Sequence, residues 1–193
     1  MSSVQALNPT IAIPTYPQAL IGYRAWRMTE DHLCALFFRN YSWSQGSNSA
    51  DCSYGHTAPD PDCYCGFNAF YSLKEAQRYI NDQLHHEAET NFYCGDVIIG
   101  AIAGKGAMEL HKQGFRCQEA QILGLVRLKV DNRSIGKAKI LYAEMRSHRQ
   151  QAFELADRYQ VPLYQDGDKL KTAINGLTGA ETMDRSLVAD LRI

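Results

Sequence analysis

Strand-like patterns of apolar and polar residues recur along the chain, and the clearest is a period-two alternation at 19–28. The other stretches that predict strands are 32–38, 66–71, 96–103, 107–111 and 115–129. Glu30-Asp31 turns the first stretch into the second, which predicts a hairpin. Gly104-Lys-Gly106 and Gln113-Gly114 are predicted turns between the last three. A meander with such short turns is typical of a small antiparallel sheet or barrel.

Helical spacing follows the capping-box pattern Ser72-Leu-Lys-Glu75, which predicts a helix through about residue 89. Two more helices are predicted near the C-terminus, over 146–160 and 168–177. The inward positions expected for the first of these are Ala152, Phe153, Ala156 and Tyr159. Residues 1–18 are predicted to form an extended arm, with a short edge strand at 11–13.

Residues 40–65 predict a loop, and about 25 residues without regular structure are unusual inside a compact domain. Four possible metal ligands fall within 14 residues of this loop: Cys52, His56, Cys63 and Cys65. Thiolates and neutral imidazole are the preferred ligands of structural zinc. A tetrahedral zinc bound by these four residues would therefore explain how the loop is held.

Several alternatives to this zinc site stay open from the sequence. His111 is a possible replacement for His56 as the fourth ligand, and Cys52 could instead form a disulfide with Cys63 or Cys65, or the thiols could be free. A catalytic zinc is disfavoured, because neither His-x-Glu with Pro-Cys-x-x-Cys nor His-Glu-x-x-His occurs. No base and orienting partner are evident for a nucleophilic cysteine. We therefore predict no catalytic residues, and an enzyme is the less favoured class.

The composition is that of a soluble globular protein, with 45% hydrophobic and 21% charged residues. No apolar run approaches the ~20 residues of a membrane span, and the N-terminus lacks a secretory signal, so the expected location is cytoplasmic. The cysteines outside the cluster, Cys34, Cys94 and Cys117, are interpreted as buried thiols. The net charge of −1 gives no general attraction to nucleic acid, although residues 127–149 carry seven Lys and Arg.

Two groups of side chains suggest ligand recognition. Arg24 and Trp26 belong to an aromatic and basic strand that could stack a base and hold a phosphate. Arg116, with Glu119 three residues later, could hold a phosphate or a carboxylate near the opening of the sheet. The structural alternatives are core aromatics beside solvated arginines, and a surface pair at a turn. No glycine-rich nucleotide-binding signature occurs.

The order of these motifs resembles a family of uncharacterised bacterial proteins that is common in actinobacteria. The resemblance covers about residues 22–125 and rests on four segments: Gly22-Tyr-Arg-x-Trp26, Ala50-x-Cys52 with His56-x-Ala-Pro59, Cys63-x-Cys-Gly66, and His111-x-x-Gly-Phe-Arg116-x-x-Glu-Ala120. A Trp-Gly pair usual in that family is replaced here by Ala103-Gly104. The resemblance implies that the cluster is one unit, and it implies no activity.

Together these patterns predict an α+β fold: a small, mostly antiparallel curved sheet or half-barrel with one crossing helix, a zinc-stapled loop and a helical C-terminal extension. The expected organisation is an arm at 1–18, a domain at 19–145 with the zinc loop at 40–66, and the extension at 146–193. The leading hypothesis is a zinc-stabilised module that binds a nucleotide, a nucleic acid or a small phosphorylated ligand. A protein–protein adaptor that uses the zinc loop is the alternative, and a hydrolase or transferase comes third.

Overall fold

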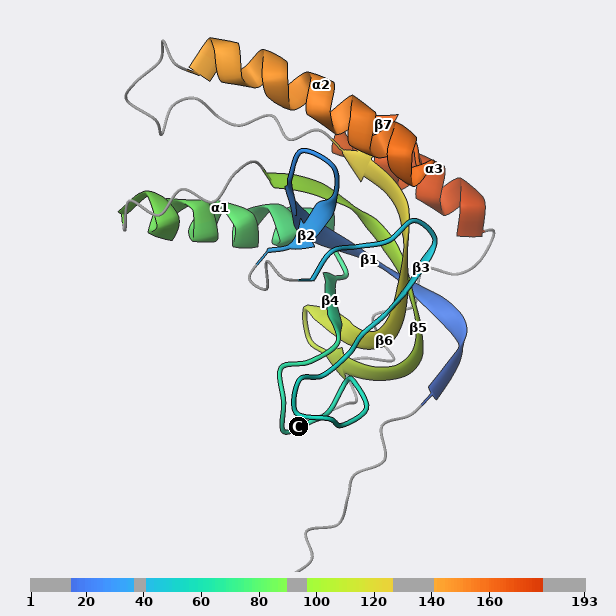
Figure 1. Ribbon diagram of the computed structural model, residues 1–193. Helices are drawn as coiled ribbons and strands as arrows, with labels where there is room; N and C mark the ends of the chain where they lie inside the picture. The colour runs from blue at the N-terminus through green and yellow to red at the C-terminus, as the bar shows by residue number, and fades with distance from the viewer. Residues whose placement is uncertain (1–14, 37–40, 90–96, 127–140, 179–193) are drawn as a thin grey trace, which may run out of the picture.

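The computed structural model describes residues 15–36, 41–89, 97–126 and 141–178 (Figure 1). The predicted edge strand at 11–13, Cys94 and most of the basic segment at 127–149 lie outside these residues. Over these residues the fold is α+β, as predicted, with a curved seven-stranded sheet and three helices. No helix of the described residues combines the length and the apolar character needed to cross a membrane.

The sheet curls into a partial ring. Its strands are β1 (Thr15–Met28), β2 (Leu33–Ala35), β3 (Ser47–Ser49), β4 (Phe67–Phe70), β5 (Val97–His111), β6 (Gly114–Val126) and β7 (Leu163–Tyr164). β1 pairs with β5, β5 with β6, β6 with β4, and β4 returns to β1 through the single pair Tyr23↔Phe70. All pairings are antiparallel except that of β7 with β6.

The side chain of Phe115 occupies the inside of the partial ring that the strands form. A Cβ atom added at Gly22 on β1 would lie 2.7 Å from this side chain, and one added at Gly104 on β5 would lie 2.6 Å from it. Glycine at both positions therefore lets two strands approach the same aromatic side chain. The prediction of a turn at Gly104-Lys-Gly106 was wrong. β5 continues through these residues, with a register shift between Lys105 and Met108 and a positive φ of 77° at Gly106.

The helices are α1 (Leu73–Glu89), α2 (Leu141–Tyr159) and α3 (Gly167–Thr178). α1 begins as the capping pattern predicted, because the Glu75 N–H donates to Ser72 Oγ at 3.1 Å. In Figure 1, α2 and α3 lie at one end of the sheet, and the long loop before β4 lies at the opposite end. The metal-ligand cluster and the C-terminal helices are thus separate features of the fold.

The C-terminal helices contribute to the core of the sheet instead of forming a separate layer beyond it. Ala152, Leu155, Ala156 and Tyr159 of α2 pack in one buried cluster with Trp26 and Trp43, and Leu170 and Ile174 of α3 pack in a second one with Leu73 and Ile80. The inward placement predicted for Phe153 was wrong, since this side chain is 51% exposed. Cys34 and Cys117 are buried, as predicted.

Candidate metal centre

The loop between β3 and β4 folds back on itself through tight backbone turns. The Gly55 N–H donates to the Cys52 carbonyl at 2.9 Å, and φ of Gly55 is 81°. The Cys63 N–H donates to the Asp60 carbonyl at 3.1 Å, and the Asp62 N–H to Asp60 Oδ1 at 2.9 Å. These turns use the Gly and Asp chemistry that made the segment a predicted loop. They bring Cys52 and His56 close to Cys63 and Cys65.

The four predicted metal ligands meet in one place. The ligand atoms of Cys52, His56, Cys63 and Cys65 all lie within 4.8 Å of one another, close enough to hold a metal ion. Cys52 Sγ lies 3.8 Å from Cys63 Sγ and 3.4 Å from His56 Nε2. Cys65 Sγ lies 3.7 Å from His56 Nδ1. His111 is outside this group and lies near Glu109, so His56 is the histidine that completes the cluster.

These separations match the edges of a tetrahedral metal site. Metal–sulfur bonds of about 2.3 Å at tetrahedral angles require sulfur atoms about 3.8 Å apart, and a nitrogen ligand at about 2.0 Å shortens an edge to about 3.5 Å. The distance from Cys52 Sγ to Cys63 Sγ is 3.8 Å, and that from Cys52 Sγ to His56 Nε2 is 3.4 Å. No disulfide joins Cys52 to Cys63 or Cys65. The donor set therefore fits a thiophilic cation.

The electrostatics of the thiols also favour a cation. Against the opposing effect of burial, hydrogen bonds with the backbone of Cys65 and with the Cys52 thiol lower the pKa of Cys63. Burial, together with the neighbouring thiols, raises the pKa of Cys65 to about 11. Neighbouring thiolates repel one another, and a divalent cation between them would remove that repulsion.

The surroundings of His56 resemble those of a metal-bound imidazole. Nε2 faces Cys52, and the other ring nitrogen, Nδ1, lies 3.7 Å from Cys65 Sγ and 3.9 Å from a carboxylate oxygen of Asp60. A carboxylate beside the second nitrogen orients the ring and increases its basicity. The exposed ring of Tyr54 stacks on the imidazole, with the two ring centroids 6.3 Å apart. The sequence analysis did not single out Asp60, although its position four residues after His56 was a usable signal.

Arg116 fastens the loop to the sheet. Its guanidinium group donates to the carbonyl oxygens of Cys63, Cys65 and Asp60, and it forms an ion pair with Glu109. The Arg116 residue is 8% exposed. A guanidinium carries five N–H donors in a fixed plane and can join several acceptors at once. Arg116 is therefore a structural clamp that joins the loop backbone at Asp60, Cys63 and Cys65 to the sheet.

The sequence analysis missed Glu109 as the partner of Arg116. In the β5–β6 hairpin, Glu109 pairs directly with Arg116, and His111 with Gly114. A two-residue connection at Lys112-Gln113 gives this register, and the predicted turn one residue later does not. Glu119, the residue proposed beside Arg116, is exposed and pairs in register with Ser49 and Lys105. Arg116 and Glu119 are therefore not brought together.

Arg24 and Trp26 also pack against neighbouring side chains of the protein. Trp26 is completely buried, and its ring meets Trp43 edge to face at 5.3 Å between centroids. The Arg24 guanidinium lies 5.3 Å from the centroid of the Trp43 ring, and Nη1 donates to the Asn68 carbonyl at 2.7 Å. Burial lowers the pKa of Arg24 to about 10, so the side chain remains charged at neutral pH. The two residues lie on the same face of β1 and both pack against Trp43, and because Trp26 is completely buried they form no exposed base-stacking surface.

Comparisons with protein-family models, with curated proteins and with solved structures found no match for this chain. The resemblance to an uncharacterised bacterial family consequently stays a prediction.

Proposed function

We propose that this chain is a zinc-stabilised protein-interaction module. Zinc would be held by Cys52, His56, Cys63 and Cys65 and would serve as a structural ion. The observation that carries this proposal is the mutual distance of four thiol and imidazole donors, all within 4.8 Å. Soft thiolate donors with an imidazole favour zinc among the common divalent ions, and four protein ligands leave no open position for a substrate.

The metal content of the purified chain tests the first half of this proposal. We expect about one equivalent of zinc per chain, because the ligand set is complete within one loop. Protein purified without added metal is to be analysed by inductively coupled plasma mass spectrometry, with thiol titration before and after chelation. Release of zinc together with three newly reactive thiols is the expected result. A stoichiometry below about half an equivalent, with the thiols already reactive, would contradict the zinc site.

The exposed surface of the same loop supports protein binding. Tyr54 is 83% exposed and Tyr64 is 90% exposed. Tyr54 directly precedes the turn at Gly55, and Tyr64 lies between Cys63 and Cys65. Exposed aromatic side chains on a rigid support are typical of interaction sites. Residues 41–66 include Asp51, Asp60 and Asp62 and no Lys or Arg. This acidic character disfavours phosphate-rich ligands at the loop, so the adaptor hypothesis has more support here than nucleic-acid recognition.

Replacing Tyr54 and Tyr64 with alanine tests the interaction surface. We expect the double variant to keep its zinc and its stability, since both side chains are exposed, and to lose a partner captured by crosslinking in cells. Aromatic anchors at an interface contribute about 2 kcal/mol each, which is more than tenfold in affinity per residue. Phe153→Ala is the matched control, because Phe153 is an exposed aromatic residue on α2. Equal capture by the double variant and the control would contradict this surface.

A further inference from the structure

One edge of β6 carries a gap in its strand pairing. β5 pairs along one edge of β6, and the other edge is covered in turn by β4 at 114–117, by β3 at 119–121 and by β7 at 125–126. In the part of the chain that the structure describes, no strand pairs with residues 122–124 on this second edge. Three residues of a strand extend about 10 Å. The gap therefore has the length of a three-residue strand segment.

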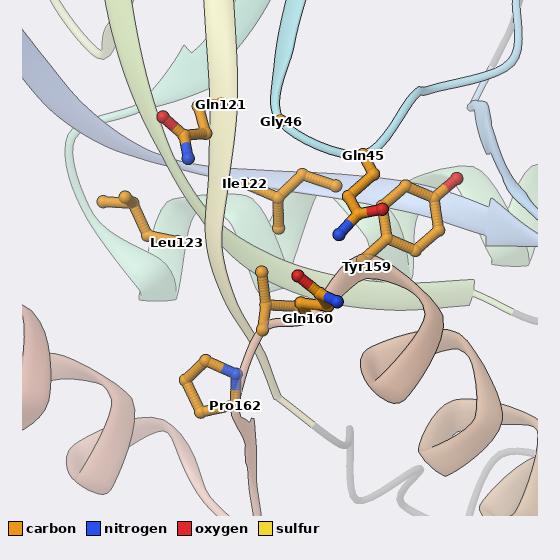
Figure 2. A pocket seen from close by; sticks show the side chains of 9 residues that line it. Gln45, Gly46, Gln121, Ile122, Leu123, Tyr159, Gln160 and Pro162 are labelled. Carbon is orange, nitrogen blue, oxygen red and sulfur yellow. The ribbon is translucent and has the colours of Figure 1, made fainter.

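A groove of about 370 Å³ lies over this gap (Figure 2). Three segments that are distant in sequence line it: Gln45 and Gly46 before β3, Gln121 to Leu123 on β6, and Tyr159 to Pro162 after α2. Figure 2 shows the Gln45 and Gln160 side chains on the same side of the β6 strand, beside Ile122. None of the lining residues is charged. The lining combines three carboxamides with apolar side chains, which fits a neutral ligand that both donates and accepts hydrogen bonds.

The side of the groove that Gln45 and Gly46 form, before β3, is held in place by the buried side chain of Asn48. Asn48 is 4% exposed, and its Oδ1 accepts from the Ser44 N–H at 2.7 Å. Its Nδ2 donates to the carbonyl oxygens of Ser44 and Gly46. This side chain fixes the turn that carries Gln45. The groove is thus bordered on this side by a preformed turn.

The opposite side of the groove is formed by the end of α2, which is also held in place by hydrogen bonds. The Tyr159 hydroxyl donates to the Trp43 carbonyl at 2.6 Å and accepts from the Leu33 N–H at 2.9 Å. The Val161 N–H returns to the Ala156 carbonyl at 3.0 Å, and the Leu125 N–H donates to the Pro162 carbonyl at 2.9 Å. Both walls are therefore positioned before any ligand arrives, which lowers the entropy lost on binding.

Gln160 has an unusual backbone for its residue type. Its φ is 52°, and it is the non-glycine residue with a positive φ among the described residues. The bonds at the end of α2 form a Schellman motif with Gln160 at the left-handed position, where glycine is the usual residue. A side chain there is unfavourable, and strained positions of this kind often mark ligand contacts. Here the strained residue places a carboxamide in the groove.

We propose that this groove binds an extended, uncharged peptide segment of a partner protein, which adds to the edge of β6 between β3 and β7. A peptide backbone presents the alternating N–H and C=O groups that an open strand edge and the carboxamides of Gln45 and Gln160 can satisfy. The uncharged lining favours a segment without Lys, Arg, Asp or Glu, because a buried unpaired charge is unfavourable. None of the four residues of the Cys/His cluster lines the groove. This proposal therefore stands independently of the zinc and of the Tyr54 and Tyr64 surface.

A peptide titration of the full ¹⁵N-labelled chain tests the proposal. The probe is a pool of hexapeptides that are acetylated, amidated and built only from uncharged residues. We expect shifts at the side-chain amides of Gln45 and Gln160 and at the backbone N–H of Ile122, which shares the edge direction of Gln118. A matched pool with alternate N-methylated residues, which lack half of the backbone donors, is expected to produce no shifts. Absence of shifts with the first pool, equal shifts with both pools, or the same shifts on concentrating the protein without peptide would overturn the proposal.

Replacing Gln160 with glycine separates binding from folding. Glycine adopts the left-handed backbone without strain, so the unfolding midpoint is expected to rise by about 2–4 °C. The same change removes one carboxamide, so peptide affinity is expected to fall at least fivefold. Gln113→Ala, an exposed glutamine at the opposite end of β6, is the control and is expected to leave both quantities unchanged. A Gln160→Gly variant that binds the peptide pool as tightly as the unmodified chain would overturn the role of this wall.

Discussion

Replacing Cys65 with serine is expected to abolish zinc retention and to unfold the loop over residues 50–66 while the sheet remains folded. A four-ligand site loses most of its affinity when one thiolate is replaced, so we expect less than about a fifth of an equivalent of zinc. Fixing the backbone of each loop residue costs about 1–2 kcal/mol. In the described loop, Ala58 is one of few buried apolar residues, so hydrophobic burial offsets little of that cost.

Hydrogen exchange measured by mass spectrometry gives the readout for this variant. Protection is expected to be lost in the loop and retained in β5 and β6, whose mutual pairing is independent of the metal. Cys34→Ala is the matched control, since Cys34 is a buried thiol outside the cluster, and it is expected to keep its zinc. If the Cys65→Ser loop exchanged as slowly as that of the unmodified chain, the metal would not be what holds the loop.

Replacing Arg116 with methionine is expected to have the second large effect, a loss of about 3–5 kcal/mol of stability. The change removes the donors to three loop carbonyls and leaves the Glu109 carboxylate, whose side chain is 25% exposed, without its ion-pair partner. Urea unfolding measures the stability, and competition with a chelator measures the zinc affinity. We expect both to fall, because the loop would lose its attachment to β6.

A second substitution separates two effects of losing Arg116: the lost hydrogen bonds to the loop and the carboxylate of Glu109 left behind. The double variant Arg116→Met with Glu109→Gln is expected to regain part of the stability, since it removes the unpaired carboxylate, but to regain none of the zinc affinity. Arg116→Lys is expected to fall in between, because an ammonium group cannot reach three carbonyls and a carboxylate from one plane. An Arg116→Met variant within about 0.5 kcal/mol of the unmodified chain would contradict the clamp.

The Cys/His cluster was predictable because its four residues are close in sequence. Cys52 to Cys65 span 14 residues, and tight turns at Gly55 and Asp60 are signalled by their residue types. The role of Arg116 was not predictable in the same way. It depends on the hairpin register that sets Glu109 opposite Arg116, and a one-residue difference in the turn changes that partner. The glycines at Gly104–Gly106 were likewise interpreted as a turn, although they form a bulge within β5.

Local chemistry in the sequence determined the class of fold, the capped start of α1, the two buried thiols Cys34 and Cys117, and the four members of the Cys/His cluster. Each depends on periodicity or on spacing within about 20 residues, where the chain itself limits the geometry. Only the tertiary structure decided that His56 and not His111 completes the cluster and that Trp26 belongs to the core. It alone assembled the groove, whose walls come from residues 45, 122 and 160. Contacts between such distant segments depend on strand register and helix packing, which no local pattern encodes.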